Sequence, residues 1–284
     1  MYTTTEIVNR IKSEGFCSYD VNQIINVKKL RKKFDNLIYS GAVNIPRRGG
    51  HNILSLKKGD LENYHKLLNK PSNKITLKKF QLGEHAYRND VVHITAKNPL
   101  IDLPCLNEFV FNPIVQKIAD CYLDGHSALG YVKVKKSYAN NLSIRSSNHK
   151  FHIDDNATKI LKFLFYLDDV STEGGAFQFV ARSHTTGALR HSEQVTFEDL
   201  EIFKLFGRSS IREFKGPAGT CIIADTLGLH KEGTATKKDR YSVIVNYVLE
   251  PEYQGTRNKQ MASSDYISAL PERQKRMARF LNIV

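Results

Sequence analysis

The chain lacks a long apolar run, a leader-like N-terminus and any patterned spacing of its cysteines. No stretch of about 18 consecutive apolar residues occurs in its 284 residues, which argues against a transmembrane helix. The first residues lack the basic and apolar regions of a signal peptide. The four cysteines show neither metal-site nor disulfide spacing. We therefore expect a protein of the reducing cytoplasm.

Acidic residues are outnumbered by basic ones. The 42 lysines and arginines exceed the 29 acidic residues by 13, which gives a net charge of +13. Such a surplus suits nucleic acid, an anionic membrane, an anionic small molecule or a lysine-rich surface without a function. No basic run is interleaved with regularly spaced aromatics, and the motifs of common nucleic-acid-binding modules are missing. We expect no nucleic-acid partner, and a basic binding module stays open as the alternative outside enzymes.

The N-terminal part has the periodicity of helices. Apolar residues recur at helical spacing in two segments, 5–12, which ends before Gly15, and 27–37. A third helix is expected at 60–68. A fourth is expected to begin with Asn112 as its cap and Pro113 as its first residue, and to run to about residue 123.

From about residue 128 the segments become short and rich in Val, Ile, Phe and Tyr, which is typical of strands. The predicted strands are 129–136, 159–167, 176–181, 219–224 and 240–249. Thr196 is expected to cap an intervening helix, and Pro271 to open a last helix that ends near residue 281. Helices followed by many short strands indicate a mainly β fold with flanking helices, a closed double sheet.

No internal repeat, low-complexity segment or long linker divides the chain. We therefore expect one domain over residues 1–284. Its parts would be a mostly helical flank at 1–127, a strand core at 128–250 and a C-terminal helical segment at 251–284.

Two histidines and one aspartate form a motif that points to chemistry. His152 and Asp154 are two positions apart, so on a strand both side chains point to one side. His230 must then come from a strand that is remote in sequence and adjacent in space. Two imidazoles and one carboxylate on one face of a metal form the facial triad of non-haem Fe(II) oxygenases. In a chain with ten histidines, a His-x-Asp triplet alone can also be structural.

The surroundings of this motif resemble the phytanoyl-CoA dioxygenase (PhyH) family of Fe(II)- and 2-oxoglutarate-dependent oxygenases. The resemblance covers most of the length and rests on the order of its pieces. These pieces are the helix leading into Glu14-Gly15-Phe16, the helix ending near 122–125, the stretch from His152-Ile153-Asp154 through Tyr166-Leu167-Asp168-Asp169-Val170 to Ser183-His184, and the stretch from Gly216-Pro217-Ala218-Gly219-Thr220 through Asp225-Thr226 and His230 to Gly233 and Arg240.

This resemblance implies a double-stranded β-helix, a cupin-like jelly roll, with iron at one mouth. It implies His152, Asp154 and His230 as the Fe(II) ligands, and 2-oxoglutarate and O₂ as cosubstrates. Arg240 matches the arginine that pairs with the distal carboxylate of 2-oxoglutarate, a role that suits a guanidinium. Thr234 is a further candidate for that carboxylate.

The family often places that hydroxyl nearer the histidine, where this chain has Lys231 and Glu232. Asp154 is present, whereas related halogenases lose this carboxylate. We therefore expect hydroxylation of an unactivated carbon, with release of succinate and CO₂. Desaturation, epimerisation and cyclisation at the same centre stay open.

Alternation along one predicted strand bears on the substrate. Tyr131, Lys133 and Lys135 lie on one of its faces. Lysines directed into a barrel would be costly without anionic partners, so inward lysines would imply an anionic small-molecule substrate. In the alternative arrangement these lysines face solvent, and Val132 and Val134 face the core.

Two arginines are further candidates for substrate binding. Arg145 lies in the polar loop that precedes His152, a loop that could cover substrate. Arg182 stands where the family commonly has glycine, so this loop could bind an anion. His184, next to it, is expected to be a structural loop residue. The sequence predicts no oligomeric state.

Overall fold

The computed structural model describes residues 2–40, 43–44, 93–139, 149–154, 157–186, 196–250 and 260–284. The helix predicted at 60–68 and the candidate Arg145 lie outside these residues.

Helices α1 (Thr4–Glu14) and α6 (Pro113–Leu123) begin and end at the predicted signals, whereas α2 (Val27–Ser40) runs three residues beyond the predicted end at 37. Helix α1 starts with a capping box between Thr3 and Glu6 and ends at Gly15, whose φ of 90° is left-handed. Helix α6 is capped by Asn112, whose side chain accepts a hydrogen bond from the Ile114 amide. The other helices are α4 (Pro99–Asp102), α5 (Asn107–Val110), α7 (Asp199–Phe206), α8 (Ser264–Ser268) and α9 (Glu272–Met277).

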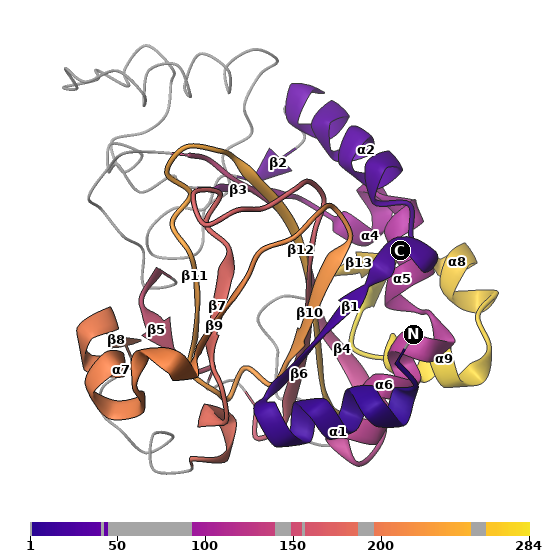
Figure 1. Cartoon of the computed structure of the whole chain (residues 1–284). Coiled ribbons are helices and arrows are strands. Elements are labelled where there is room, and N and C mark those ends of the chain that lie inside the picture. The colour runs from indigo at the N-terminus through magenta and orange to yellow at the C-terminus, as the bar shows by residue number, and fades with distance from the viewer. Residues whose placement is uncertain are drawn as a thin grey trace.

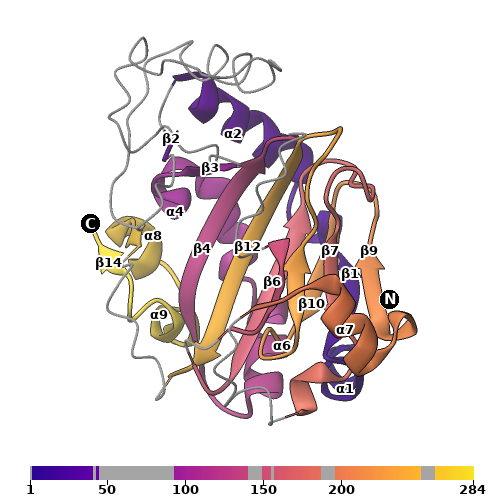
Figure 2. The same ribbon diagram turned by 90° about the vertical axis from the view of Figure 1, so that its left-hand side faces the viewer.

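Seven strands form a large antiparallel sheet in the order β1-β10-β6-β12-β4-β3-β2. Their bounds are Phe16–Asp20 for β1, Thr220–Ala224 for β10, Ile160–Tyr166 for β6, Arg240–Leu249 for β12, Ser127–Ser137 for β4, His93–Ala96 for β3 and Val43–Asn44 for β2. Figure 2 shows β4, β12, β6 and β10 running side by side. The stretch 1–127 is thus not only a helical flank, because it supplies both edges of this sheet.

A second antiparallel sheet has the order β8-β5-β11-β7-β9. Its strands are β8 (Thr196–Phe197), β5 (Phe151–His152), β11 (His230–Glu232), β7 (Phe177–Val180) and β9 (Ile211–Phe214). A short parallel pair, β13 (Met261–Ala262) and β14 (Asn282–Ile283), lies near the C-terminus.

The large sheet is buried on both faces. In Figure 1 helices α2, α4, α5 and α6 cover one face, and β5, β7, β9 and β11 lie on the other side. Alternate residues of β6 accordingly enter different cores: Leu161, Phe163 and Phe165 pack with the helices, whereas Leu164 and Tyr166 pack between the sheets. Two facing antiparallel sheets covered by helices form the jelly-roll fold that we expected from the sequence.

Two helix predictions need correction. Thr196 does not cap a helix, since it pairs with His152 in β8, and the cap of α7 is Glu198, whose side chain forms a capping box with Glu201. The last helix stops at Met277, well before residue 281. None of the described helices is long and apolar enough to cross a membrane. The single-domain division stays a prediction.

Candidate metal centre

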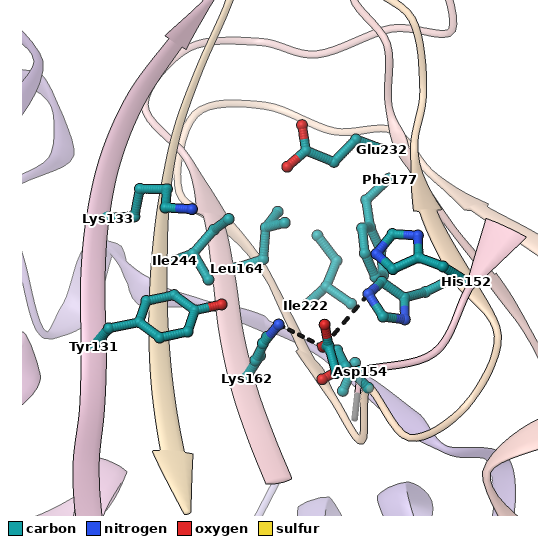
Figure 3. Close-up of a pocket in the computed structure, with 13 residues that line it drawn as sticks. Tyr131, Lys133, His152, Asp154, Lys162, Leu164, Phe177, Ile222, Glu232 and Ile244 are labelled. Carbon is teal, nitrogen blue, oxygen red and sulfur yellow. Dashed lines mark hydrogen bonds and ion pairs between the residues drawn. The ribbon is translucent and has the colours of Figure 1, made fainter. Parts of the chain in front are cut away.

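A cavity of about 210 Å³ lies between the two sheets. Strands of the large sheet supply Tyr131, Lys133, Lys162, Leu164, Ile222, Ala224 and Ile244, and the second sheet with its flanking loops supplies His152, Asp154, Phe177, Thr226, His230 and Glu232. Figure 3 shows these side chains around the cavity. Its volume is below the roughly 300–1,000 Å³ of pockets that enclose a drug-sized ligand, so a metal with a small acid would fill much of it.

His152, Asp154 and His230 meet at one wall of this cavity. The two histidines are direct partners in the pairing of β5 with β11. We had expected Asp154 on the same strand as His152. Strand β5 ends at His152, however, so Asp154 lies in the following loop. The Asp154 amide donates to the Thr226 carbonyl at 2.9 Å, which holds this loop against the segment that leads to His230.

The geometry of these three side chains suits one metal ion. One potential ligand atom from each lies within 4.8 Å of the others, and the His230 Nε2–Asp154 Oδ2 distance is 3.6 Å. Bonds of about 2.1 Å to a shared ion place neighbouring ligand atoms about 3–4 Å apart. A small contraction around an ion would therefore bring the three side chains into a facial triad.

The backbone fixes the tautomer of both histidines. His152 Nδ1 lies 3.0 Å from the Lys150 carbonyl oxygen, and His230 Nδ1 lies 2.9 Å from that of Gly228. A carbonyl only accepts, so each Nδ1 carries the proton and each Nε2 presents a lone pair. This arrangement is typical of metal-ligating histidines. Burial lowers the pKa of His230 to about 3, which keeps its imidazole neutral.

A lysine that we did not predict pairs with the aspartate of this group. Lys162 Nζ, on β6, forms an ion pair with Asp154 Oδ2 (Figure 3). Burial alone would raise the pKa of Asp154, but the Lys162 cation outweighs burial and holds it below its ordinary value. The aspartate is therefore ionised.

Arg240, the predicted partner of 2-oxoglutarate, lies in a buried ion network. Its side chain is 3% exposed, Nη2 donates to Glu232 Oε2 at 2.9 Å and Nη1 donates to the Gly233 carbonyl at 3.1 Å. Lys135 Nζ binds the same Glu232 carboxylate. Although burial raises the pKa of Glu232, these two cations lower it well below its ordinary value. The group therefore consists of two cations and one carboxylate.

The other sequence candidates lie at the cavity, in the buried network beside it, or at the surface. Lys133 lines the cavity but is exposed, whereas Lys135 is buried with 3% of its side chain exposed. The alternative in which this strand face is turned to solvent therefore holds for Lys133 and is wrong for Lys135, and Val132 and Val134 face the core as that alternative expected. Arg182 is not brought to the cavity: its side chain is 72% exposed and binds Glu14 Oε1 at 2.8 Å. Thr234, a described residue of the loop after β11, does not line the cavity either. His184 Nε2 contacts the Lys12 carbonyl, as a structural histidine would.

Sequence reasoning missed Glu232 and Lys162 as cavity residues, although both carry a usable signal. Glu232 is two positions after His230, so on one strand both point to the same side. Lys162 is the single charge in the otherwise apolar-aromatic run of β6. An isolated charge inside a strand buried on both faces needs a partner.

Comparisons with known proteins show the fold. No family model matches the sequence, and no curated protein matches it. The structure is similar to the epimerase SnoN in complex with Fe³⁺, alpha-ketoglutarate and nogalamycin RO, with a TM-score of 0.58, 13% identity, and coverage of 95% of this chain and 90% of SnoN.

Two further solved structures share the architecture. EctD from S. alaskensis, solved with 2-oxoglutarate and 5-hydroxyectoine, has a TM-score of 0.54 at 13% identity over 89% of this chain and 77% of its own. HygX from Streptomyces hygroscopicus, solved with nickel, 2-oxoglutarate and hygromycin B, has a TM-score of 0.51 at 11% identity over 93% and 92%. This chain therefore has the jelly-roll fold of these proteins.

Proposed function

We propose that this chain is an Fe(II)- and 2-oxoglutarate-dependent dioxygenase of the phytanoyl-CoA dioxygenase type, acting in the cytoplasm. The observation that carries the proposal is the convergence of His152, Asp154 and His230 on one wall of a cavity between the two sheets, with both Nε2 lone pairs available. SnoN, EctD and HygX, which share the fold, were solved with 2-oxoglutarate, and two of them with a metal.

The protein residues would hold and shield the reacting groups. His152, Asp154 and His230 would bind Fe(II) on one face and leave positions for 2-oxoglutarate and O₂. When bound, the iron supplies the oxidising chemistry, and 2-oxoglutarate leaves as succinate and CO₂. Leu164, Ile222 and Ile244 form an apolar wall that limits water around the centre.

The proposed substrate is a small anionic metabolite, hydroxylated at an unactivated carbon. Lys133 supports the charge assignment, because its exposed side chain lines the cavity and its Nζ lies 5.5 Å from the centre of the Tyr131 ring. The limited volume of the cavity favours a small substrate or the end of a longer one.

An alternative outcome at the same centre is epimerisation. SnoN, the neighbour with the TM-score of 0.58, is described as an epimerase. Desaturation and cyclisation need the same metal and cosubstrate, and product analysis distinguishes these outcomes.

The first test is anaerobic titration of the protein with Fe(II) and then 2-oxoglutarate. We expect the weak visible charge-transfer band of a chelated 2-oxo acid, and its loss in His152→Ala. His126→Ala is the matched control, because His126 is exposed and outside the cavity. A screen for succinate release across anionic metabolites then identifies the substrate. No band in the wild type, together with salt-sensitive nucleic-acid binding, would instead support the basic binding module.

A further inference from the structure

The Glu232 carboxylate binds the guanidinium of Arg240, which the resemblance to the phytanoyl-CoA dioxygenase family assigns to the distal carboxylate of 2-oxoglutarate. Arg240 Nη2 donates to Glu232 Oε2 at 2.9 Å, and Lys135 binds both oxygens of the same carboxylate. The Lys135 and Arg240 side chains are each 3% exposed. Little water therefore reaches these ion pairs, so solvent weakens the attraction between their charges only slightly.

Glu232 also belongs to the cavity. It is one of the lining residues, and Figure 3 shows its carboxylate at the other end of the cavity from Asp154 and Lys162. His230 and Glu232 extend from the same strand, β11, toward the same interior. A 2-oxo acid bound at the triad with its tail toward Arg240 would lie along this strand and meet the Glu232 carboxylate.

A purely structural ion network accounts less well for this placement. Burying charges costs free energy that an ion pair only partly recovers, and apolar residues in their place are often as stable. A structural network also needs no contact with a cavity. Here the carboxylate faces the cavity, and its two cations leave one positive charge in excess, so a second carboxylate can be accommodated near them once Glu232 turns aside.

We propose that Glu232 is a cosubstrate-selecting residue that occupies the Lys135–Arg240 anchor and must leave it before a dicarboxylic 2-oxo acid binds. This inference rests on the proposed function of the metal centre. Binding of 2-oxoglutarate then includes the cost of displacing an internal carboxylate. A 2-oxo acid of equal length without the distal carboxylate, 2-oxopentanoate, chelates the metal without that displacement.

The test compares the two acids on the Ni(II)-loaded protein by isothermal titration calorimetry. In Glu232→Ser the internal competitor is gone, and we expect 2-oxoglutarate to bind at least about tenfold more tightly than in the wild type, as follows from removing a like charge at the anchor. Because 2-oxopentanoate has no distal carboxylate, its affinity is expected to change by less than about twofold. Glu173→Ser is the matched control, since Glu173 forms an exposed ion pair with Lys237.

A second variant guards against misfolding, because Glu232→Ser leaves two buried cations without their carboxylate. Lys135→Met combined with Glu232→Ser keeps Arg240 alone and restores one cation for one distal carboxylate. This double variant is expected to bind 2-oxoglutarate more tightly than the Lys135→Met single variant does. Thermal unfolding without ligand checks that each variant is folded.

The outcomes separate this inference from the proposed function. Tighter 2-oxoglutarate binding with unchanged 2-oxopentanoate binding supports the selecting role. Equal affinity of wild type and folded Glu232 variants for 2-oxoglutarate overturns it, while the proposed function stands. Failure of every variant and of the wild type to bind Ni(II) or either acid overturns the proposed function, and the inference with it.

Discussion

The two faces of the seven-stranded sheet carry different kinds of residue. On the helix-covered face, β6 contributes Leu161, Phe163 and Phe165 to an apolar core. On the inner face the same strand carries Lys162 beside Leu164, and β4 carries Lys133 and Lys135. One face mainly stabilises the fold, whereas the other holds the groups that can bind ligands. Substitutions on the two faces should therefore have separable effects.

The largest loss of stability is expected from Phe163→Ala on the helix-covered face. Phe163 is 2% exposed, and its ring packs edge-on against Phe109 and Tyr247 at centroid distances of 5.9 and 5.6 Å. Truncation leaves a cavity and should lower the free energy of unfolding by about 3–5 kcal/mol. Chemical denaturation measures this loss. Leu164→Ala, one residue on but facing the cavity, should cost less, and equal costs would contradict the division between the faces.

The largest effect on the inner face is expected from His230→Gln, and it concerns binding rather than stability. Gln approximates the size of the imidazole but offers no aromatic nitrogen to the metal. Affinity for Ni(II) or Fe(II) should fall by at least about a hundredfold, since even residues that only support a ligand contribute 10–100-fold. Metal titration followed by calorimetry measures it. A thermal midpoint close to that of the wild type, with metal affinity retained, would show that His230 is not a ligand.

Gly175→Ala tests a turn that affects both the stability of the fold and the binding of ligands. Gly175 has a φ of 76°, and an added Cβ would lie 2.4 Å from the Gly233 carbonyl oxygen and 2.7 Å from Arg240 Nη1. Left-handed backbone strain and this collision should cost about 2 kcal/mol of stability. The Arg240–Gly233 hydrogen bond should be disturbed at the same time. Denaturation gives the stability, and 2-oxoglutarate titration shows whether the anchor moves. Gly207→Ala, also at a φ of 76° but with Ser209 Oγ at an ordinary contact distance of 3.9 Å from the added Cβ, controls for backbone strain without a collision.

The sequence predicted much of the fold because periodicity and caps are local signals. Asn112-Pro113 and Gly15 mark helix ends by their own side chains or conformations, and β12 has the predicted bounds of 240–249. Thr196 failed as a cap because pairing with His152 in β8, a tertiary interaction, overrides the local preference for a helix start. The pairing of strands distant in sequence is not local, so it could not be read in the same way.

The same difference between local signals and tertiary contacts applies to the candidate site. The sequence predicted the candidate ligands His152, Asp154 and His230, because their spacing and the family resemblance both point to these positions. That Arg240 binds Glu232, and that Lys162 binds Asp154, follows only from bringing β11, β12 and β6 to one cavity. Arg182 was a candidate on its motif position alone, and its left-handed backbone directs it to Glu14 instead. Motifs therefore named the candidate metal ligands, whereas the ion-pair partner of each charged residue could be seen only in the fold.

The smallest predicted effect is on the pH dependence of stability. It involves His93, a residue of β3 next to the Lys135–Arg240 anchor. Burial and the nearby Lys135 cation lower the pKa of His93 from 6.5 to about 3, against the opposing effect of Glu232. In the unfolded chain His93 binds its proton near pH 6.5, but in the folded chain it stays neutral until about pH 3. The stability that depends on the neutral form is thus complete above pH 6.5 and is lost progressively as the pH falls toward 3.

His93→Asn removes this titration and should reduce the acid sensitivity of the fold. The thermal midpoint of the wild type should fall between pH 7.5 and pH 5 by more than that of the variant, and other buried histidines, such as His230, contribute equally to both. Thermal unfolding at the two pH values measures the difference. An identical fall in both proteins would mean that His93 is solvated and titrates normally. The anchor face would then be more open to water than the burial of Lys135 and Arg240 indicates.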